Sequence, residues 1–101
     1  MGKILTIDEI KASVAKVAPE YGVKRVTLFG SYAEGKQKPG SDIDLLVEFN
    51  KDRQIPVTLF TLGGMASEVE DLTGKEVDII PFPIPRDSLI IIGKEVLLYG
   101  T

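Results

Sequence analysis

The stretch DIDLLVEF, residues 42–49, constrains the fold of this chain more than any other feature. Successive side chains of a strand point to opposite faces, so its apolar residues share one face and Asp42 and Asp44 share the other. The apolar set is Ile43, Leu45 and Val47. Carboxylates inside a core are costly unless a cation meets them. We therefore expect a strand with one buried face and two acids that face away from the core.

The first half of the chain predicts a helix followed by another strand. Residues 5–22 space their apolar positions for one helix face: Ile7, Ile10, Val14, Val17 and Tyr21. Thr6 and Glu9 fit a capping box at its start, and Pro19 and Gly22 mark its exit. Residues 23–30 alternate as a strand that ends at Gly30, and a helical turn is expected after Ser31.

The second half predicts a helix, a third strand and a last helix. Residues 57–75 form the expected helix, with Pro56 as its start and Gly74 as its C-terminal cap. Its apolar face is predicted to contain Leu59, Leu62, Ala66 and Val69. Gly63 and Gly64 in that helix suggest a close approach or a bend, because each costs about 1 kcal/mol against alanine.

The end of the chain is less clearly patterned. Residues 75–82 are expected to form the third strand, and residues 81–85 a stiff extended linker. Residues 86–100 fit a helix capped near Asp87, although Ile90, Ile91 and Ile92 are equally good strand formers. The order predicts one α+β (mixed α/β) domain spanning residues 1–101, with helices packed on a small sheet.

Composition excludes several kinds of chemistry. The chain has no cysteine and no histidine, which removes disulfides, thiolate zinc sites and imidazole general bases. A formal net charge of −3 argues against binding nucleic acid through bulk electrostatics. No apolar run approaches the roughly 20 residues needed to cross a bilayer, so we expect a cytoplasmic protein.

Asp42 and Asp44 are suited to a magnesium ion. On one strand face their side chains project roughly 6 to 7 Å apart, so both can reach a cation between them. Mg²⁺ prefers oxygen ligands and is commonly held by one or two carboxylates together with substrate phosphates. Asp78 in the third strand would permit a second ion if the strands are neighbours. A polar strand edge that faces water is the alternative.

Gly30 and Ser31 complement these acids. A glycine at a strand end lets the backbone approach a phosphate, and a turn beginning at Ser31 would aim free N–H groups at its oxygens. The simpler alternative is a turn with a helix cap. Lys36 and Lys38 follow in a polar loop and are more typical of solvated residues than of ligands.

In this order, GSYAEGKQKPGSDIDLLVEF resembles the signature of the minimal nucleotidyltransferase (MNT) family, within the DNA polymerase β-like nucleotidyltransferase superfamily. The first helix, LFGS and GKEVDII also fall in the family's order. The resemblance implies that Gly30 and Ser31 bind nucleotide phosphates, with Ser41 in a positioning role at that site. It implies that Asp42, Asp44 and Asp78 are the catalytic carboxylates and bind Mg²⁺, with two ions expected.

The resemblance also implies an activity and a partner. The expected reaction moves AMP from ATP to a hydroxyl, in this family a tyrosine of a HEPN-domain toxin, so that the protein acts as an antitoxin. Glu34 departs from the family pattern, in which many members carry arginine. This departure leaves open a second function, a weak or inactive module that neutralises the HEPN ribonuclease by binding it. Modification of an aminoglycoside-like molecule ranks lower, and a homo-oligomer stays open.

Overall fold

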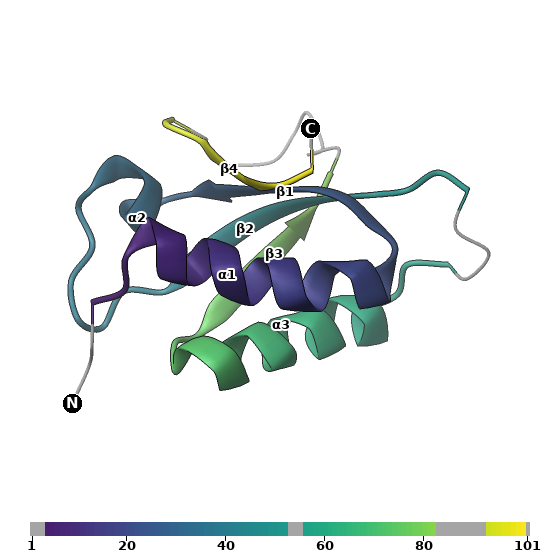
Figure 1. The fold of residues 1–101 in the computed structure, drawn as a ribbon, viewed down its shortest axis with the longest axis horizontal. Helices are drawn as coiled ribbons and strands as arrows, with labels where there is room; N and C mark the ends of the chain where they lie inside the picture. Colours follow the sequence, from purple (N-terminus) through teal and green to yellow (C-terminus); the bar gives the residue numbers. More distant parts are fainter. Residues whose placement is uncertain (1–3, 53–55, 83–92, 101) are drawn as a thin grey trace.

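A computed structural model describes residues 4–52, 56–82 and 93–100. Figure 1 shows their elements, which follow in the order α1 (Ile7–Val17), the 3-10 helix η1 (Ala18–Tyr21), β1 (Val23–Phe29), α2 (Ser31–Glu34), β2 (Ile43–Phe49), α3 (Leu59–Thr73), β3 (Val77–Pro81) and β4 (Val96–Tyr99). The predicted helices at the two long amphipathic segments, the turn after Ser31 and the three predicted strands are all present.

The four strands form one mixed sheet in the order β3-β2-β1-β4. β1 is antiparallel to β2 and to β4, whereas β2 and β3 are parallel. Helices α1 and α3 lie side by side on the same face of this sheet (Figure 1). This mixed sheet with helices packed against it confirms the predicted α+β class.

The buried face of β2 is the one that its alternation predicts. Ile43, Leu45 and Val47 are fully buried against the helices. The helices contribute a matching set of buried residues, namely Ile10, Val14, Val17, Met65 and Val69. Because the apolar side chains of β2 point to the helices, its alternate side chains are left for the opposite face of the sheet.

Helix α1 begins as its sequence predicts, whereas α3 does not. The capping box of Thr6 and Glu9 is present at α1. Pro56 is not the start of α3, which begins at Leu59 because Thr58 and Thr61 form a reciprocal capping box there. Two predicted core positions are also wrong. Leu59 is 85% exposed and Ile7 is 37% exposed, since each lies in the first turn of its helix.

The predicted last helix is wrong where the structure describes it. Residues 96–99 form strand β4, which pairs with β1 through Thr27 and Leu97 among others. Its sequence, VLLY, is rich in strand-forming residues, and the open edge of β1 provides their hydrogen-bonding partners. The linker residues 83–85 and the helix residues 86–92 lie outside the described part of the chain.

The two central glycines of α3 behave differently. A Cβ on Gly64 would lie 3.1 Å from the hydroxyl of Tyr21, so this glycine permits the close approach that the sequence suggested. Nothing lies within 4 Å of a Cβ on Gly63. The Tyr21 hydroxyl donates a hydrogen bond to Glu68, and this carboxylate raises the pKa of Tyr21 to about 12. Within the described ranges, no helix is long and apolar enough to cross a membrane.

Candidate functional site

Strands β2 and β3 place two of the predicted acids side by side. Asp44 lies directly opposite Asp78 in the parallel ladder. Asp42 comes immediately before β2 and is exposed, as is Asp78, whereas Asp44 is half-buried. The expectation that neighbouring strands bring these acids together is thus met at the backbone level. The three acids thus lie near the N-terminal end of β2.

The carboxyl group of Asp44 is close enough to both other acids for their charges to affect its pKa. Burial raises the pKa of its carboxyl group, and the negative charges of Asp78 and Asp42 raise it further. Burial and like charges both disfavour the ionised form. A cation bound beside Asp44 would reverse the effect of its neighbours, because an opposite charge favours the carboxylate.

The residues present fit a magnesium ion that completes its coordination with phosphate and water. In the described part of the chain, no three acidic side chains converge into a ready-made set of metal ligands. Asp44 with either Asp42 or Asp78 supplies the one or two carboxylates that Mg²⁺ commonly takes from a protein. The hard oxygen donors and their mutual repulsion both suit this ion.

Gly30 brings the backbone of the predicted phosphate turn against Asp44. Phe29 pairs with Asp44 in the sheet, and Gly30 follows with a φ of 77°. A Cβ added at Gly30 would lie 2.1 Å from Oδ2 of Asp44, which is far inside van der Waals contact. Only glycine allows this conformation and this approach together. The turn and the carboxylate are therefore parts of one site.

Helix α2 is a single turn anchored by its apolar residues. Tyr32 and Ala33 are buried, and Gly35 ends the helix in the left-handed conformation. Ser31 is partly exposed at its start. Glu34 points away from the core and forms an ion pair with Lys36, whose Nζ lies 3.7 Å from Oε1 of Glu34. The departure from the family pattern is therefore an exposed acid with a cation beside it.

Ser41 organises the loop that precedes Asp42. Its Oγ accepts a hydrogen bond of 2.8 Å from the backbone N–H of Lys38, and its own N–H donates to the carbonyl of Lys38. These two bonds close a tight turn. This arrangement agrees with a positioning role for Ser41, although the nucleotide contacts predicted for Gly30, Ser31 and Ser41 stay predictions.

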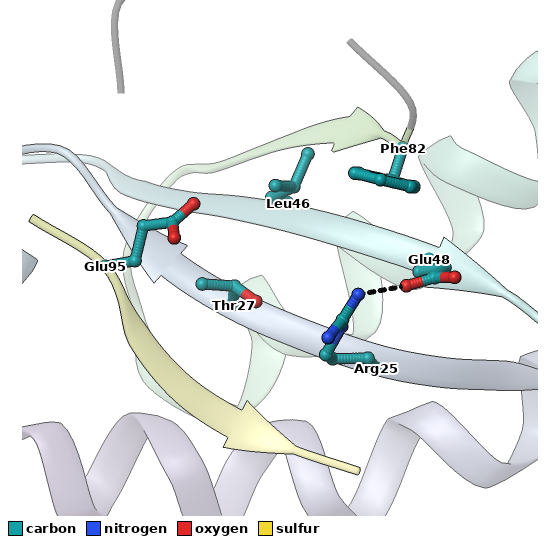
Figure 2. Close-up of a pocket in the computed structure, with 6 residues that line it drawn as sticks. All are labelled: Arg25, Thr27, Leu46, Glu48, Phe82 and Glu95. Atoms are coloured by element: carbon teal, nitrogen blue, oxygen red, sulfur yellow. Dashed lines mark hydrogen bonds and ion pairs between the residues drawn. The ribbon is translucent and has the colours of Figure 1, made fainter. Parts of the chain in front are cut away.

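The sheet face that carries Asp44 continues into a hollow of 180 Å³ that the sequence reasoning missed. Figure 2 shows its lining, which comprises Arg25, Thr27, Leu46, Glu48, Phe82 and Glu95. Leu46 and Glu48 follow Asp44 at the alternate positions of β2. The period of two that assigned Asp44 to this face would have assigned these residues to it as well.

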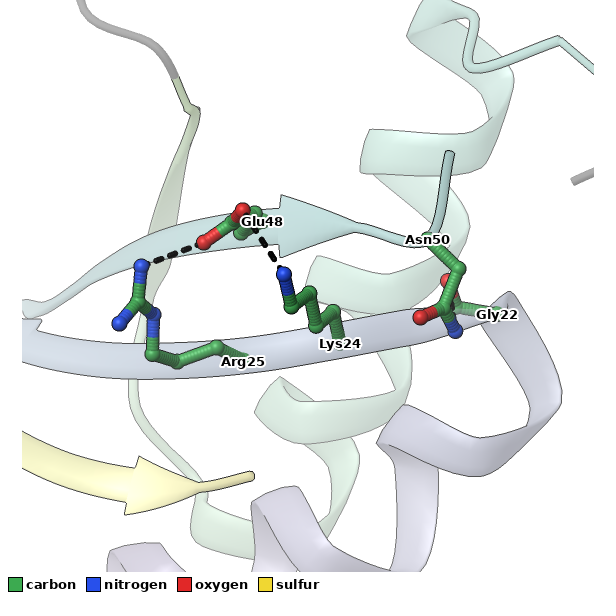
Figure 3. A network of polar contacts seen from close by, with 5 residues as sticks. All are labelled: Gly22, Lys24, Arg25, Glu48 and Asn50. Carbon is green, nitrogen blue, oxygen red and sulfur yellow. Dashed lines mark hydrogen bonds and ion pairs between the residues drawn. The ribbon is translucent and has the colours of Figure 1, made fainter. Parts of the chain in front are cut away.

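One end of this hollow is charged. Arg25 Nη2 lies 2.5 Å from Oε1 of Glu48, and Lys24 Nζ lies 3.8 Å from its Oε2 (Figure 3). Close by in Figure 3, the side-chain amide of Asn50 donates to the carbonyl of Gly22 and holds the start of β1 to the end of β2. The hollow thus combines an apolar wall with a fixed ion pair.

A model of the nucleotidyltransferase domain family matches residues 7–98. MJ0435 of Methanocaldococcus jannaschii, whose name assigns it provisionally to the protein adenylyltransferases, is 37% identical over 97 residues, covering 92% of this chain and all of that protein. The protein adenylyltransferase MntA of Thermococcus cleftensis is 32% identical over 81 residues, which cover 76% of this chain and 78% of that protein.

Solved structures share the fold. A crystal structure of a toxin-antitoxin with AMP-PNP has a TM-score of 0.65 at 21% identity, covering 96% of this chain and 75% of that chain. A complex of the tri-AMPylated HEPN toxin of Shewanella oneidensis with MNT antitoxin has a TM-score of 0.64 at 16% identity, covering 95% of this chain and 74% of that chain.

The mixed sheet, its paired helices and the carboxylates beside a glycine-serine turn define a nucleotidyltransferase-type protein. The chain belongs to the nucleotidyltransferase domain family. Its membership confirms the predicted class of enzyme, and the curated relatives confirm the resemblance to the MNT group.

Proposed function

We propose that this protein transfers AMP from ATP to a hydroxyl group of a HEPN-domain toxin and so acts as its antitoxin. The observation that carries the proposal is the contact between Gly30 and the Asp44 carboxylate, which joins a backbone turn suited to phosphate with a group suited to metal. The relatives named as protein adenylyltransferases and the neighbours that are toxin-antitoxin complexes support the choice of donor and acceptor.

In this mechanism the acceptor oxygen forms a bond to the α-phosphorus of ATP while the bond to the pyrophosphate oxygen breaks and the hydroxyl proton is released. Bound Mg²⁺ would offset the charge of the triphosphate and of the leaving pyrophosphate. Asp42, Asp44 and Asp78 would hold the metal. Gly30 and Ser31 would contact the phosphates from the other side. We expect a tyrosine as the acceptor and two ions in the complete complex.

The acceptor side chain would approach over the sheet face that carries Asp44. The hollow of Figure 2 begins two residues further along β2, at Leu46. That spacing is roughly 6 to 7 Å, about the length of an aromatic side chain with its hydroxyl. The apolar wall of Leu46 and Phe82 suits such a ring. A protein acceptor would supply further walls around the site.

The decisive experiment uses purified protein with α-labelled ATP, Mg²⁺ and the HEPN partner. We expect covalent label on the partner with the wild type, and loss of label with Asp42→Asn or Asp44→Asn and after addition of EDTA. Transfer that survives both substitutions would rule out this mechanism. Asp71→Asn, an exposed acid of α3, is the matched control and should label the partner normally.

A second candidate is a binding module that neutralises the toxin by covering it. Glu34 supports this candidate, because a glutamate near a triphosphate repels it unless a cation intervenes. A stable complex in which the partner carries no label, together with toxin inhibition that is unaffected by Asp44→Asn, would favour the module over the enzyme.

A further inference from the structure

Lys75 is unusual in its burial. Among the residues that the structure describes, it is the one charged side chain in the buried class, with 8% of the residue exposed. A buried ammonium group is costly unless its donors are used, so a lysine in such a place needs a specific partner. Its Nζ donates a hydrogen bond to the carbonyl oxygen of Pro39, which lies in the loop before Asp42.

The backbone from which Lys75 extends is firmly held. Gly74 ends α3 and donates its N–H to the carbonyl of Glu70. The N–H of Lys75 donates to the hydroxyl of Thr73, and the N–H of Val77 donates to the carboxylate of Glu70. The turn between α3 and β3 is thus fixed on both sides of Lys75, and its side chain reaches out from a rigid base.

The segment that Lys75 contacts leads directly to the first aspartate. The turn from Lys38 to Ser41 is closed by its own two hydrogen bonds, but the bond from Lys75 ties that turn to the rest of the domain. Beyond Asp42, the N–H of Ile43 donates to the carbonyl of Glu76 at 2.9 Å. Residues 75 and 76 therefore fasten the chain on both sides of Asp42.

Of the three acids, Asp42 depends most on these two hydrogen bonds for its position. Asp44 and Asp78 are fixed by the ladder of β2 and β3, whereas Asp42 stands outside any strand and is exposed. Asp42 and Lys75 also line one shallow hollow, with the loop on one side and the turn after α3 on the other. The backbone position of Asp42 relative to Asp44 depends on how the loop is attached.

We propose that Lys75 is a positioning residue that holds Asp42 in place for divalent metal binding through its hydrogen bond to Pro39. The inference rests on the proposed metal-dependent function, and it adds a residue that touches neither metal nor nucleotide. Loss of groups that support metal ligands typically lowers metal affinity by about 10- to 100-fold. Lys75→Met removes the donor and keeps most of the side-chain volume.

The test measures Mn²⁺ binding by isothermal titration calorimetry in the absence of nucleotide. We expect Lys75→Met to raise the Kd for Mn²⁺ by about tenfold with little change in melting temperature, and Lys75→Arg to restore most of the affinity because its guanidinium can donate to the same carbonyl. Lys51→Met, at an exposed lysine after β2, removes the same charge and should bind as the wild type. Unchanged affinity in Lys75→Met overturns the inference.

Two further measurements distinguish a failure of the inference about Lys75 from a failure of the proposed function. Asp42→Asn should weaken Mn²⁺ binding. A wild type that fails to bind Mn²⁺ both alone and with a non-hydrolysable ATP analogue contradicts the proposed function itself, and a wild type that binds Mn²⁺ only with the analogue is compared with the variants in its presence. Amide exchange without metal then tests the attachment alone, since Lys75→Met should speed exchange at Ser41 and Ile43. Unchanged exchange there also overturns the inference. If Lys75→Met fails to fold, Lys75→Gln replaces it in both measurements with the same expected direction.

Discussion

The backbone of Gly30 is packed directly against the carboxylate of Asp44, where a Cβ would lie 2.1 Å from Oδ2. The relationship joins the end of β1 to the inner acid of β2, and the sheet register that pairs Phe29 with Asp44 produces it. Any side chain added at Gly30 would have to displace the carboxylate of Asp44. The geometry of the acid therefore depends on a glycine outside β2, in the turn between β1 and α2.

The first prediction concerns Gly30→Ala. The new methyl group would displace Asp44, and the φ of 77° is unfavourable for any residue with a Cβ, at a cost of about 1 to 3 kcal/mol. Misplacement of a reacting group by about 1 Å can cost 100-fold in rate, so we expect a loss of about that size in AMP transfer. Single-turnover labelling measures it.

Gly40→Ala is the matched control for this change. A Cβ at Gly40 meets nothing within 4 Å, although the residue lies in the loop before the same acid. Its transfer rate should stay within about twofold of the wild type. Equal activity in Gly30→Ala and the wild type would show that the contact with Asp44 is unimportant for the reaction.

The second prediction links Asp44 to pH. The folded protein raises the pKa of this carboxyl above its ordinary value of 3.8. The protonated form of Asp44 therefore stabilises the folded state relative to the unfolded state, compared with the ionised form. The associated stability is fully present below pH 3.8 and is lost as the pH rises through the folded-state pKa. Asp44→Asn should therefore increase the free energy of unfolding at pH 7 in EDTA, with a smaller gain as the pH falls toward 3.8.

Urea denaturation at several pH values measures this dependence. Mg²⁺ added to the wild type should recover part of the stability at pH 7, since a cation relieves repulsion from Asp42 and Asp78. The free energy of unfolding of Asp44→Asn should rise less on addition of Mg²⁺. An Asp44→Asn variant that is less stable than the wild type at pH 7 without metal would contradict the inference that the ionised Asp44 carboxylate destabilises the folded protein.

Asp42, Asp44 and the fold around them could be predicted from the sequence, because the patterns that indicate them are local. Alternation fixes which face of β2 is buried, and residue spacing fixes the face of α1. Strand β4 could not be predicted in this way, since VLLYG fits a helix or a strand and only the free edge of β1 decides between them. Leu59 shows the same limit, because periodicity gives a face without showing how far the sheet covers it.

The residues of the candidate site could be proposed from the sequence, whereas the contacts that hold them in place could not. The order of Gly30, Ser31, Asp42 and Asp44 could be read because the motif is short and continuous. Lys75 was missed, since a lysine after a helix-capping glycine is ordinarily solvated and its partner Pro39 is 36 residues away. Contacts between distant loops leave no periodic pattern in the sequence.

The third prediction concerns Glu34. Its carboxylate is exposed and paired with Lys36, a contact that is worth little in water and that occupies a cation near the phosphate turn. Glu34→Arg replaces a repulsive charge by an attractive one and frees Lys36. We expect ATP affinity to rise by about threefold to tenfold at low salt, with a smaller gain at high salt.

Titration with a fluorescent ATP analogue measures the affinity, and Glu20→Arg, with the same charge change at an exposed site on η1, is the control. The reverse test replaces both Lys36 and Lys38 by glutamate and should weaken ATP binding. If this double variant binds ATP as well as the wild type does, the loop lysines have no part in holding the nucleotide.

The last prediction separates the two glycines of α3. Gly63→Ala should raise the free energy of unfolding by about 1 kcal/mol, because alanine favours the helix and a Cβ there meets nothing within 4 Å. At Gly64 the same gain is offset, since a Cβ would press at 3.1 Å on the Tyr21 hydroxyl that bonds to Glu68. Thermal and urea denaturation should therefore place Gly64→Ala below Gly63→Ala, and the difference should shrink in a Tyr21→Phe background. Equal stabilisation by both substitutions would mean that the Tyr21 side chain can move away from a Cβ on Gly64 with no loss of stability.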